Sequence, residues 1–245
     1  MDITLAHRAY EELRGMVARG QLQPGARLVN RSLAKTLNVS QTPIREAISR
    51  LVTEGVAELV PGAGAFVRRV ELHDLTHLYE LREMLEPYAA GLAARNAADF
   101  EVHELRRVCE DWLRLAREIR DTPTRTATDA IMARWNDNEE QYHTLIISAS
   151  RNRWLQSIAG NLRLLTAAFT PQRQDPALLS LAGAAATWRE HTRIVRAIRA
   201  RDSHRASDLM RLHIAVGKMN VLRRLQKAGS DIQQPRPTAH PTPPL

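Results

Sequence analysis

Cysteine, aromatic residues and long apolar runs are all scarce in this chain of 245 residues. Its single cysteine, Cys109, excludes an internal disulfide, and its place in a helical stretch predicts a thiol in or near the core. The sequence has no run of about 18 apolar residues, so we expect no membrane-spanning helix. The first residues carry acidic groups and lack the apolar centre of a signal sequence, which predicts a cytoplasmic protein.

The composition is ordinary for a globular chain, with 44% hydrophobic and 25% charged residues, and predicts one large or two modest domains. The net charge of +8 suits a polyanionic partner, but arginine-rich proteins often have such a charge, so it selects no function alone. Aromatic residues make up only 4% of the chain. We expect the tryptophans to pack in the core or at an interface; they are Trp112, Trp135, Trp154 and Trp188.

Residues 20–67 have the pattern of a winged helix-turn-helix, which places one helix in the major groove of DNA. Asn30 is expected to cap a short helix over residues 31–37, and residues 38–40 form a tight turn. A second helix opens at Thr42-Pro43, where proline is tolerated because the first helical turn has no partner for its N–H.

A hairpin follows the second helix, with strands at residues 56–60 and 65–70 and a tip at residues 61–64. This tip would be the wing. The outer face of the second helix presents side chains that suit phosphates and base edges. They are Gln41, Thr42, Arg45, Ser49 and Arg50. The alternative is a helix pair and hairpin in which Arg45 and Arg50 are simply solvated.

The region after the hairpin has helical periodicity throughout, without strand alternation. It predicts an all-α bundle of six to seven helices, over residues 72–97, 101–120, 126–150, 154–169, 178–200 and 203–227, with a further short helix near 179–185. The proline-rich end of the chain is expected to be disordered. The predicted fold class is therefore mostly α, with a winged helix-turn-helix domain at 1–70, a helical domain at 71–228 and a tail at 229–245.

A second chemical pattern lies in the helical region. Glu139 and His143 are four residues apart, so they face the same way on one helix. His191 and His213 lie in later helices. If these side chains converge, they would bind a divalent transition metal such as zinc, nickel or manganese. Spacing cannot establish convergence, and a lone histidine on a helix is more often a core or surface residue.

The first region closely resembles the DNA-binding domain of GntR-family transcription regulators over roughly residues 5–70. The resemblance rests on Leu22-x-Pro24-Gly25-x-x-Leu28 and on the run from Leu33-Ala34 to Thr42-Pro43-Ile44-Arg45-Glu46-Ala47. It implies a set of DNA contacts comprising Arg31, Gln41, Thr42, Arg45 and Gly64. Arg45 would read guanine, and Gln41 stands where relatives usually have arginine, so the operator is expected to differ there.

The helical region resembles the FCD ligand-sensing domain of the FadR subfamily. The matching motifs are Leu78-Tyr79-Glu80-Leu81-Arg82-x-x-Leu85-Glu86, Tyr142-His143 with Ser148-Ala149-Ser150-Arg151-Asn152, and His191-x-x-Ile194-x-x-Ala197-Ile198-x-x-Arg201-Asp202 with Met210-x-x-His213. Many members bind a metal through three histidines and an aspartate. The resemblance therefore implies His143, His191 and His213 as ligands, preferably of zinc. Glu139 stands at the aspartate position, where it would ligate directly or through water.

Arg82 lies one helical turn from Glu86, which leaves two readings. It forms a surface ion pair worth a few tenths of a kcal/mol, or it clamps the carboxylate of a ligand. Effectors of the family are commonly small organic acids. The combined prediction is a homodimeric regulator, preferably a repressor, that binds a near-palindromic operator and responds to a small carboxylate; the sign of the response stays open.

Two other classes of function are compatible with parts of the sequence. A metal-dependent enzyme would use Glu139, His143, His191 and His213, but no nucleophile or general-base motif accompanies them, and the winged helix would be unexplained. An architectural DNA-binding protein would use the helical region only for dimerisation, and no ligand would change its DNA affinity.

Overall fold

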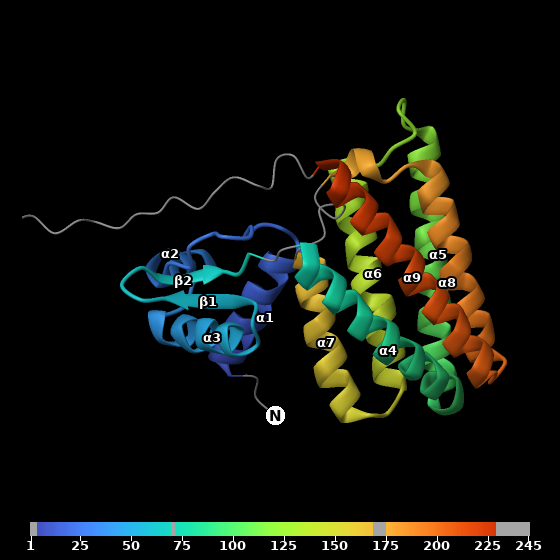
Figure 1. The fold of residues 1–245 in the computed structure, drawn as a ribbon, viewed down its shortest axis with the longest axis horizontal. Coiled ribbons are helices and arrows are strands. Elements are labelled where there is room, and N and C mark those ends of the chain that lie inside the picture. Colours follow the sequence, from blue (N-terminus) through green and yellow to red (C-terminus); the bar gives the residue numbers. More distant parts are fainter. Residues whose placement is uncertain (1–3, 70–71, 169–174, 229–245) are drawn as a thin grey trace, which may run out of the picture.

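The computed structural model describes residues 4–69, 72–168 and 175–228, and they form a small α/β part beside a larger bundle of long helices (Figure 1). The predicted fold class is confirmed: three helices and a two-stranded antiparallel hairpin precede six bundle helices in the described part of the chain. The expected tail at 229–245 lies outside the described residues.

The helix-turn-helix consists of α2 (Asn30–Leu37) and α3 (Gln41–Thr53), supported by α1 (Leu5–Ala18). The turn begins at Asn38, which has φ 52 in the left-handed region and ends α2 by donating its N–H to two carbonyls of that helix. The expected cap at Asn30 is wrong. Asn30 is the first helical residue, and Val29 is the cap residue without a side-chain hydrogen bond, because the chain becomes helical one residue early.

The wing consists of β1 (Ala57–Val60) and β2 (Gly64–Val67), with Val60 paired to Gly64 next to the tip. The second strand is shorter than predicted: it ends at Val67, which pairs with Ala57, the first residue of β1. One more backbone hydrogen bond follows, from the N–H of Arg68 to the carbonyl oxygen of Val56 at 2.9 Å, and Val70 lies outside the described residues. Gly64 has φ +105, a conformation that glycine adopts readily and other residues rarely.

The bundle agrees closely with the predicted segments. Its helices are α4 (Leu72–Asn96), α5 (Asp99–Asp121), α6 (Asp129–Ala149), α7 (Arg153–Ala168), α8 (Leu181–Arg199) and α9 (Ser203–Ala228). The short helix expected near 179–185 is wrong: a 3-10 turn, η2 (Pro176–Leu178), precedes α8, which already includes residues 181–185. Phe169, expected in α7, lies outside the described residues.

Two predicted helix breaks are made by specific caps. Asn152 begins α7 by accepting hydrogen bonds from the N–H groups of Trp154 and Leu155, at 3.2 and 3.1 Å. Asp202 accepts from the N–H of Arg205 at 3.0 Å and so begins α9. Two of the family-like motifs, around Asn152 and Asp202, therefore have a structural role in ending one helix and starting the next.

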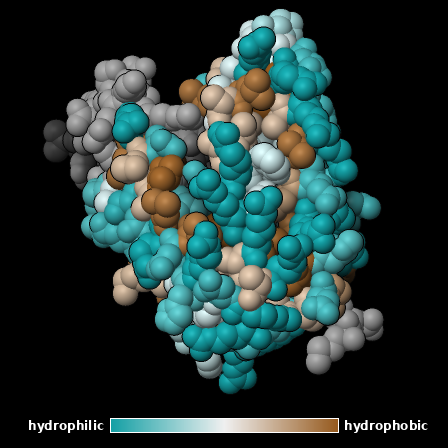
Figure 2. All heavy atoms as spheres, turned by 90° about the vertical axis from the view of Figure 1, so that its right-hand side faces the viewer, coloured by the Kyte–Doolittle hydropathy of each residue, from teal (hydrophilic) through white to brown (hydrophobic). Residues whose placement is uncertain are grey.

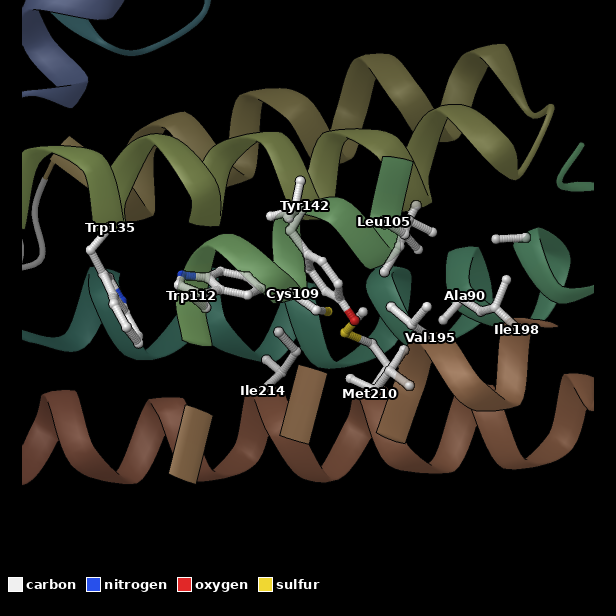
Figure 3. Close-up of a cluster of buried hydrophobic side chains, with 14 of the residues drawn as sticks. Ala90, Leu105, Cys109, Trp112, Trp135, Tyr142, Val195, Ile198, Met210 and Ile214 are labelled. Carbon is white, nitrogen blue, oxygen red and sulfur yellow. The ribbon is translucent and has the colours of Figure 1, made fainter. Parts of the chain in front are cut away.

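The core of the bundle is built around a few large side chains from different helices (Figure 3). Trp112 and Tyr142 are fully buried, and Cys109 lies beside them as predicted, with its pKa raised to about 12 by burial. Trp135 is also buried, whereas Trp154 is 67% exposed, which excludes a core position for it. The outer face over α5 and α8 is largely hydrophilic (Figure 2).

The two parts of the molecule meet through α1 and α7. The Arg14 guanidinium on α1 donates a hydrogen bond to the carbonyl oxygen of Gly160 on α7, at 3.0 Å. Leu164 on α7 is buried within the hydrophobic cluster of the winged-helix part, together with Leu13 of α1. A bundle helix thus completes the core of the winged-helix part. Within the described residues, no helix is long and apolar enough to cross a membrane.

Candidate functional site

Three histidines from different helices converge inside the bundle. His143 lies on α6, His191 on α8 and His213 on α9. One ring nitrogen from each lies within 4.8 Å of the other two. The convergence that spacing could not establish is therefore present in the fold.

Each of these imidazoles is oriented by a hydrogen bond at Nδ1. The partners are a Glu86 carboxylate oxygen for His143 at 2.6 Å, the Thr187 carbonyl for His191 at 3.0 Å and a Glu190 carboxylate oxygen for His213 at 2.9 Å. Carbonyl and carboxylate oxygens only accept, so each Nδ1 carries a hydrogen. In a neutral imidazole the lone pair is then on Nε2, the atom that would bind a metal.

Two of the Nε2 atoms have no hydrogen-bond partner. His143 Nε2 and His191 Nε2 are fully buried and unpaired, which is costly for polar atoms inside a protein. Burial lowers the pKa of His143, helped by the Arg163 charge, and lowers the pKa of His191 further, helped by His213. Both rings are therefore kept neutral, the form in which histidine ligates metals, and the donor set fits a divalent transition metal.

Glu139 lies at the same point, although it is not part of the cluster of three nitrogens. One carboxylate oxygen, Oε2, lies 3.7 Å from His143 Nε2, and the other, Oε1, lies 3.8 Å from His191 Nε2. These distances exceed those of hydrogen bonds, so the oxygens do not satisfy the two ring nitrogens. A carboxylate at this distance from both is placed to complete the ligand set.

Glu86 joins the histidine cluster to two buried arginines. Besides His143, its carboxylate contacts Arg82 Nε at 2.6 Å and an Arg163 terminal nitrogen at 3.6 Å. Burial alone would raise the pKa of Glu86, but Arg82, His143 and Arg163 outweigh it and hold this pKa well below its usual value. The Arg82–Glu86 ion pair that the sequence suggested at the surface is present, but it is buried: Arg82 is 8% exposed and Glu86 1%.

A cavity of about 260 Å³ opens beside this cluster. Its polar wall includes Arg82, Glu139, Arg163 and His213, and its apolar wall includes Met132, Trp135, Leu179 and Ile214. The size suits a small molecule, and the polar wall contains two of the candidate metal ligands, Glu139 and His213. Arg82 thus pairs with Glu86 and lines the cavity at once.

Arg163 was missed by the sequence reasoning. It lies on α7 in the run Asn161-Leu-Arg-Leu-Leu, and one arginine within an apolar run is the only local signal of a buried charge. Its guanidinium donates to the carbonyl of Glu139 at 3.1 Å and to the carboxylate of Glu140 at 3.4 Å.

Four of the five residues expected at DNA are exposed on the winged-helix part, and Gly64 is partly exposed. Gln41, Thr42 and Arg45 are exposed on α3, and Arg31 is exposed on α2. Arg31, Arg45 and Gly64 line one concavity of about 520 Å³ between α3 and the wing. The structure therefore places the two arginines and the wing glycine beside one another.

Arg50, also expected on the outer face of α3, is engaged within the protein. Its Nε donates to Glu54 at 3.0 Å, and its guanidinium lies 3.6 Å from the centre of the Tyr10 ring. The cation–π contact with Tyr10 ties α3 to α1, whereas the ion pair with Glu54 lies within the C-terminal end of α3. These contacts account for it without DNA.

A winged helix-turn-helix joined to an all-α domain is the architecture of a class of DNA-binding transcription regulators. Comparison with protein families agrees. Residues 5–67 match the family of bacterial regulatory proteins called gntR, and residues 77–216 match the FCD domain. The chain belongs to the GntR family of transcription regulators with an FCD domain, and it is a regulator rather than an enzyme.

The chain is similar to several curated regulators. It is 26% identical to the transcriptional repressor GlaR of Escherichia coli over 84% of this chain and 90% of that protein. It is 43% identical to the Nta operon transcriptional regulator of Aminobacter aminovorans, over 37% of this chain and only 43% of that one. It is 33% identical to McbR of Escherichia coli, over 44% of this chain and 49% of that one.

Solved structures support the fold. The Escherichia coli McbR/YncC structure matches with a TM-score of 0.77 at 21% identity, covering 92% of this chain and all (100%) of that one. A GntR regulator from Rhodococcus sp. RHA1 matches with a TM-score of 0.66 at 19% identity, covering 89% and 97% of the two chains. GntR regulators bind operator DNA and are usually dimers, and FCD domains often bind metals.

Proposed function

We propose that this protein is a transcription repressor whose operator affinity is controlled by a small organic acid bound beside a metal ion in the bundle. The observation that carries this proposal is the convergence of His143, His191 and His213 beside a cavity that is lined by His213 and Arg82. The proposed organisation is DNA binding at residues 1–70, sensing and dimerisation at 71–228 and a separate tail at 229–245.

The DNA-reading set comprises Arg31, Gln41, Thr42, Arg45 and the wing residue Gly64. Arg45 is exposed on α3 and is suited to bidentate contact with guanine. Gln41 is exposed at the start of the same helix and prefers adenine. Arg31 contacts phosphate or the groove edge. Gly64 lets the wing backbone approach DNA without a side chain in the way.

The metal ligands are the three histidines, with Glu139 as the oxygen ligand. A set of three imidazoles and one carboxylate favours zinc, and nickel or manganese remain compatible. When bound, the metal would supply a positive Lewis-acidic centre for a carboxylate oxygen of the effector. Glu86, Thr187 and Glu190 orient the imidazoles through their Nδ1 hydrogens.

The effector is a small carboxylate because the polar wall of the cavity is cationic at Arg82. The Nε of Arg82 is occupied by Glu86, so its terminal nitrogens would bind the acid. Effector binding changes DNA affinity by favouring one arrangement of the bundle, and therefore of the two DNA-reading heads, over another. Release of the operator on effector binding is the proposed sign.

The proposed homodimer is supported by apolar side chains that lie exposed at helical spacing. On α4 these are Leu81, Met84 and Tyr88, and on α7 they are Trp154 and Ile158. Residues three, four or seven apart lie on one face of a helix. A second copy of this chain would bury both faces, and a homodimer would place two α3 helices on a near-palindromic operator.

The metal content of gently purified full-length protein tests the sensing part of this proposal. Elemental mass spectrometry should find near-stoichiometric metal in the wild type and little in His143→Ala. His103→Ala is the matched control, because His103 is exposed on α5 away from the cluster. Metal-free wild-type protein under these conditions would refute the metal site.

DNA binding is tested by selecting duplexes from a random pool with the wild-type protein. Near-palindromic sites and loss of affinity on adding a small carboxylate would support the repressor. Palindromic sites with no carboxylate response would instead support an architectural role.

A further inference from the structure

Arg163 combines deep burial with an unsatisfied donor. Its side chain is 2% exposed, and its Nε is fully buried without a hydrogen-bond partner. The residue lines the cavity, so the unpaired N–H belongs to a side chain next to the space where a ligand would lie. Leaving such a donor unpaired is costly, and an acceptor in the cavity would remove the cost.

Arg82, the arginine expected from sequence, differs in this respect. Its Nε already donates to Glu86 at 2.6 Å, and the two residues are four apart on the same helix. Arg163 is only 3.6 Å from Glu86 through a terminal nitrogen, and its nearer contacts use its other terminal nitrogen. Of the two arginines that line the cavity, only Arg163 therefore has an Nε without a hydrogen-bond partner.

We propose, resting on the organic-acid function above, that Arg163 is the principal residue that binds the effector carboxylate. Binding of the effector at Arg163 then changes the position of α7, and α7 transmits this change to the DNA-binding part. The guanidinium of Arg163 binds the anion through Nε and an adjacent terminal nitrogen, in the planar fork that suits a carboxylate. Arg82 is then an auxiliary contact.

The second half of the proposal follows from the neighbours of Arg163 on α7. Leu164 is 3% exposed and lies in the hydrophobic cluster of the winged-helix part. One turn before Leu164, the carbonyl of Gly160 accepts the hydrogen bond of Arg14 from α1. Consecutive residues therefore contact the effector cavity and the DNA-binding core. A shift of α7 that improves the Arg163–carboxylate contact must also move the surface of α7 against which α1 packs.

The first experiment measures carboxylate binding to full-length protein by isothermal titration calorimetry. Acetate, lactate, malonate and benzoate are the probes. Arg163→Lys keeps the positive charge beside Glu86 but removes the Nε–H and the fork. We expect its Kd for the best probe to rise at least about tenfold, as for loss of a charge-assisted hydrogen bond. Arg153→Lys, exposed on the same helix, is the control and should bind as the wild type does.

The outcomes separate this inference from the function on which it rests. If no probe binds the wild type, the organic-acid function fails. If a probe binds the wild type and Arg163→Lys equally, or if only Arg82→Lys loses binding, Arg163 is not the principal binding residue and the inference is overturned.

The second experiment tests the α7 connection with Arg14→Met, which has no donor and so removes the hydrogen bond to Gly160 outside the cavity. The best probe should bind this variant with unchanged Kd. The change that the probe causes in the affinity for a selected operator should be several-fold smaller in this variant than in the wild type. An unchanged effect on operator affinity would overturn the role of α7 while leaving the binding role of Arg163 intact.

Discussion

Replacing Glu86 by glutamine should destabilise the protein and loosen its metal site together. Glu86 is 1% exposed, and its oxygens lie 2.6 Å from Arg82 Nε and 2.6 Å from His143 Nδ1. Both of these atoms donate hydrogens. A glutamine offers one oxygen and one NH2 group, so one of the two donors would face another donor.

The size of the effect follows from the charges that remain. Arg82 and Arg163 are both buried, and Glu86→Gln removes the carboxylate that they share. Removing one partner of a buried ion pair costs about 3–5 kcal/mol. Since the glutamine oxygen keeps one hydrogen bond, we expect a loss of about 3 kcal/mol in the free energy of unfolding. Losing the orientation of His143 should lower metal affinity about 10- to 100-fold.

Urea unfolding in the presence of a chelator measures the stability change without the metal contribution. A competition titration with a metal indicator then measures metal affinity. Glu80→Gln is the control, because Glu80 is exposed on the same helix and pairs with Lys218 at 3.3 Å; it should change stability by less than about 1 kcal/mol. A Glu86→Gln variant within about 1 kcal/mol of the wild type would refute the reasoning.

Three further predictions concern DNA, pH and assembly. Arg45→Ala should cost about 1–3 kcal/mol of specific operator affinity in a fluorescence anisotropy assay, and unchanged binding would remove Arg45 from the reading set. Burial lowers the pKa of His143 and His191 in the folded protein, so the unfolded chain binds more protons below pH about 6.5. Urea unfolding of metal-free protein should therefore give falling stability from about pH 6.5 to 5, and a flat profile would contradict neutral buried imidazoles. Tyr88→Glu should shift the protein towards monomer in sedimentation velocity; an unchanged dimer would place the interface elsewhere.

Much of the fold could be predicted from sequence because its elements follow local rules. The bundle helices were predicted from apolar periodicity, and their ends from residues such as Asn152 and Asp202, which cap the helices in the structure. The local rule failed at Asn30, where the helix begins one residue early. The prediction of core or interface packing for the four tryptophans did not separate Trp154, which is exposed, from the buried ones, because composition gives no information about which face of α7 meets the bundle.

The candidate site could be predicted only in part, because its contacts join helices far apart in the chain. Motif resemblance indicated the histidines and Glu139, and i,i+4 spacing indicated the Arg82–Glu86 pair. Burial of that pair depends on α6 and α7 packing against α4, which no local pattern reports. For the same reason the bond between Glu86 and His143, 57 residues apart, and the position of Arg163 emerged only from the fold.

Under the proposed function, Glu86 would connect metal binding with effector binding, because its carboxylate contacts a candidate metal ligand and both cavity arginines. An anion bound at Arg163 would partly neutralise the guanidinium charge that now stabilises the Glu86 carboxylate. The carboxylate of Glu86 would then accept more strongly from His143 Nδ1, which makes His143 Nε2 a better donor to a metal. We therefore expect the carboxylate and the metal to bind cooperatively.

Thermodynamic linkage makes this expectation strict, since the factor by which the metal tightens the carboxylate must equal the factor by which the carboxylate tightens the metal. Calorimetric titrations of the best carboxylate with and without zinc, and of zinc with and without that carboxylate, measure the two factors independently. The direct contact between the acid and the metal proposed above would contribute to both factors, and Glu86 adds to them. Both factors should therefore fall in Glu86→Gln and stay unchanged in Glu80→Gln. Coupling of unchanged size in Glu86→Gln would mean that the direct contact carries all of it, so that Glu86 only orients His143.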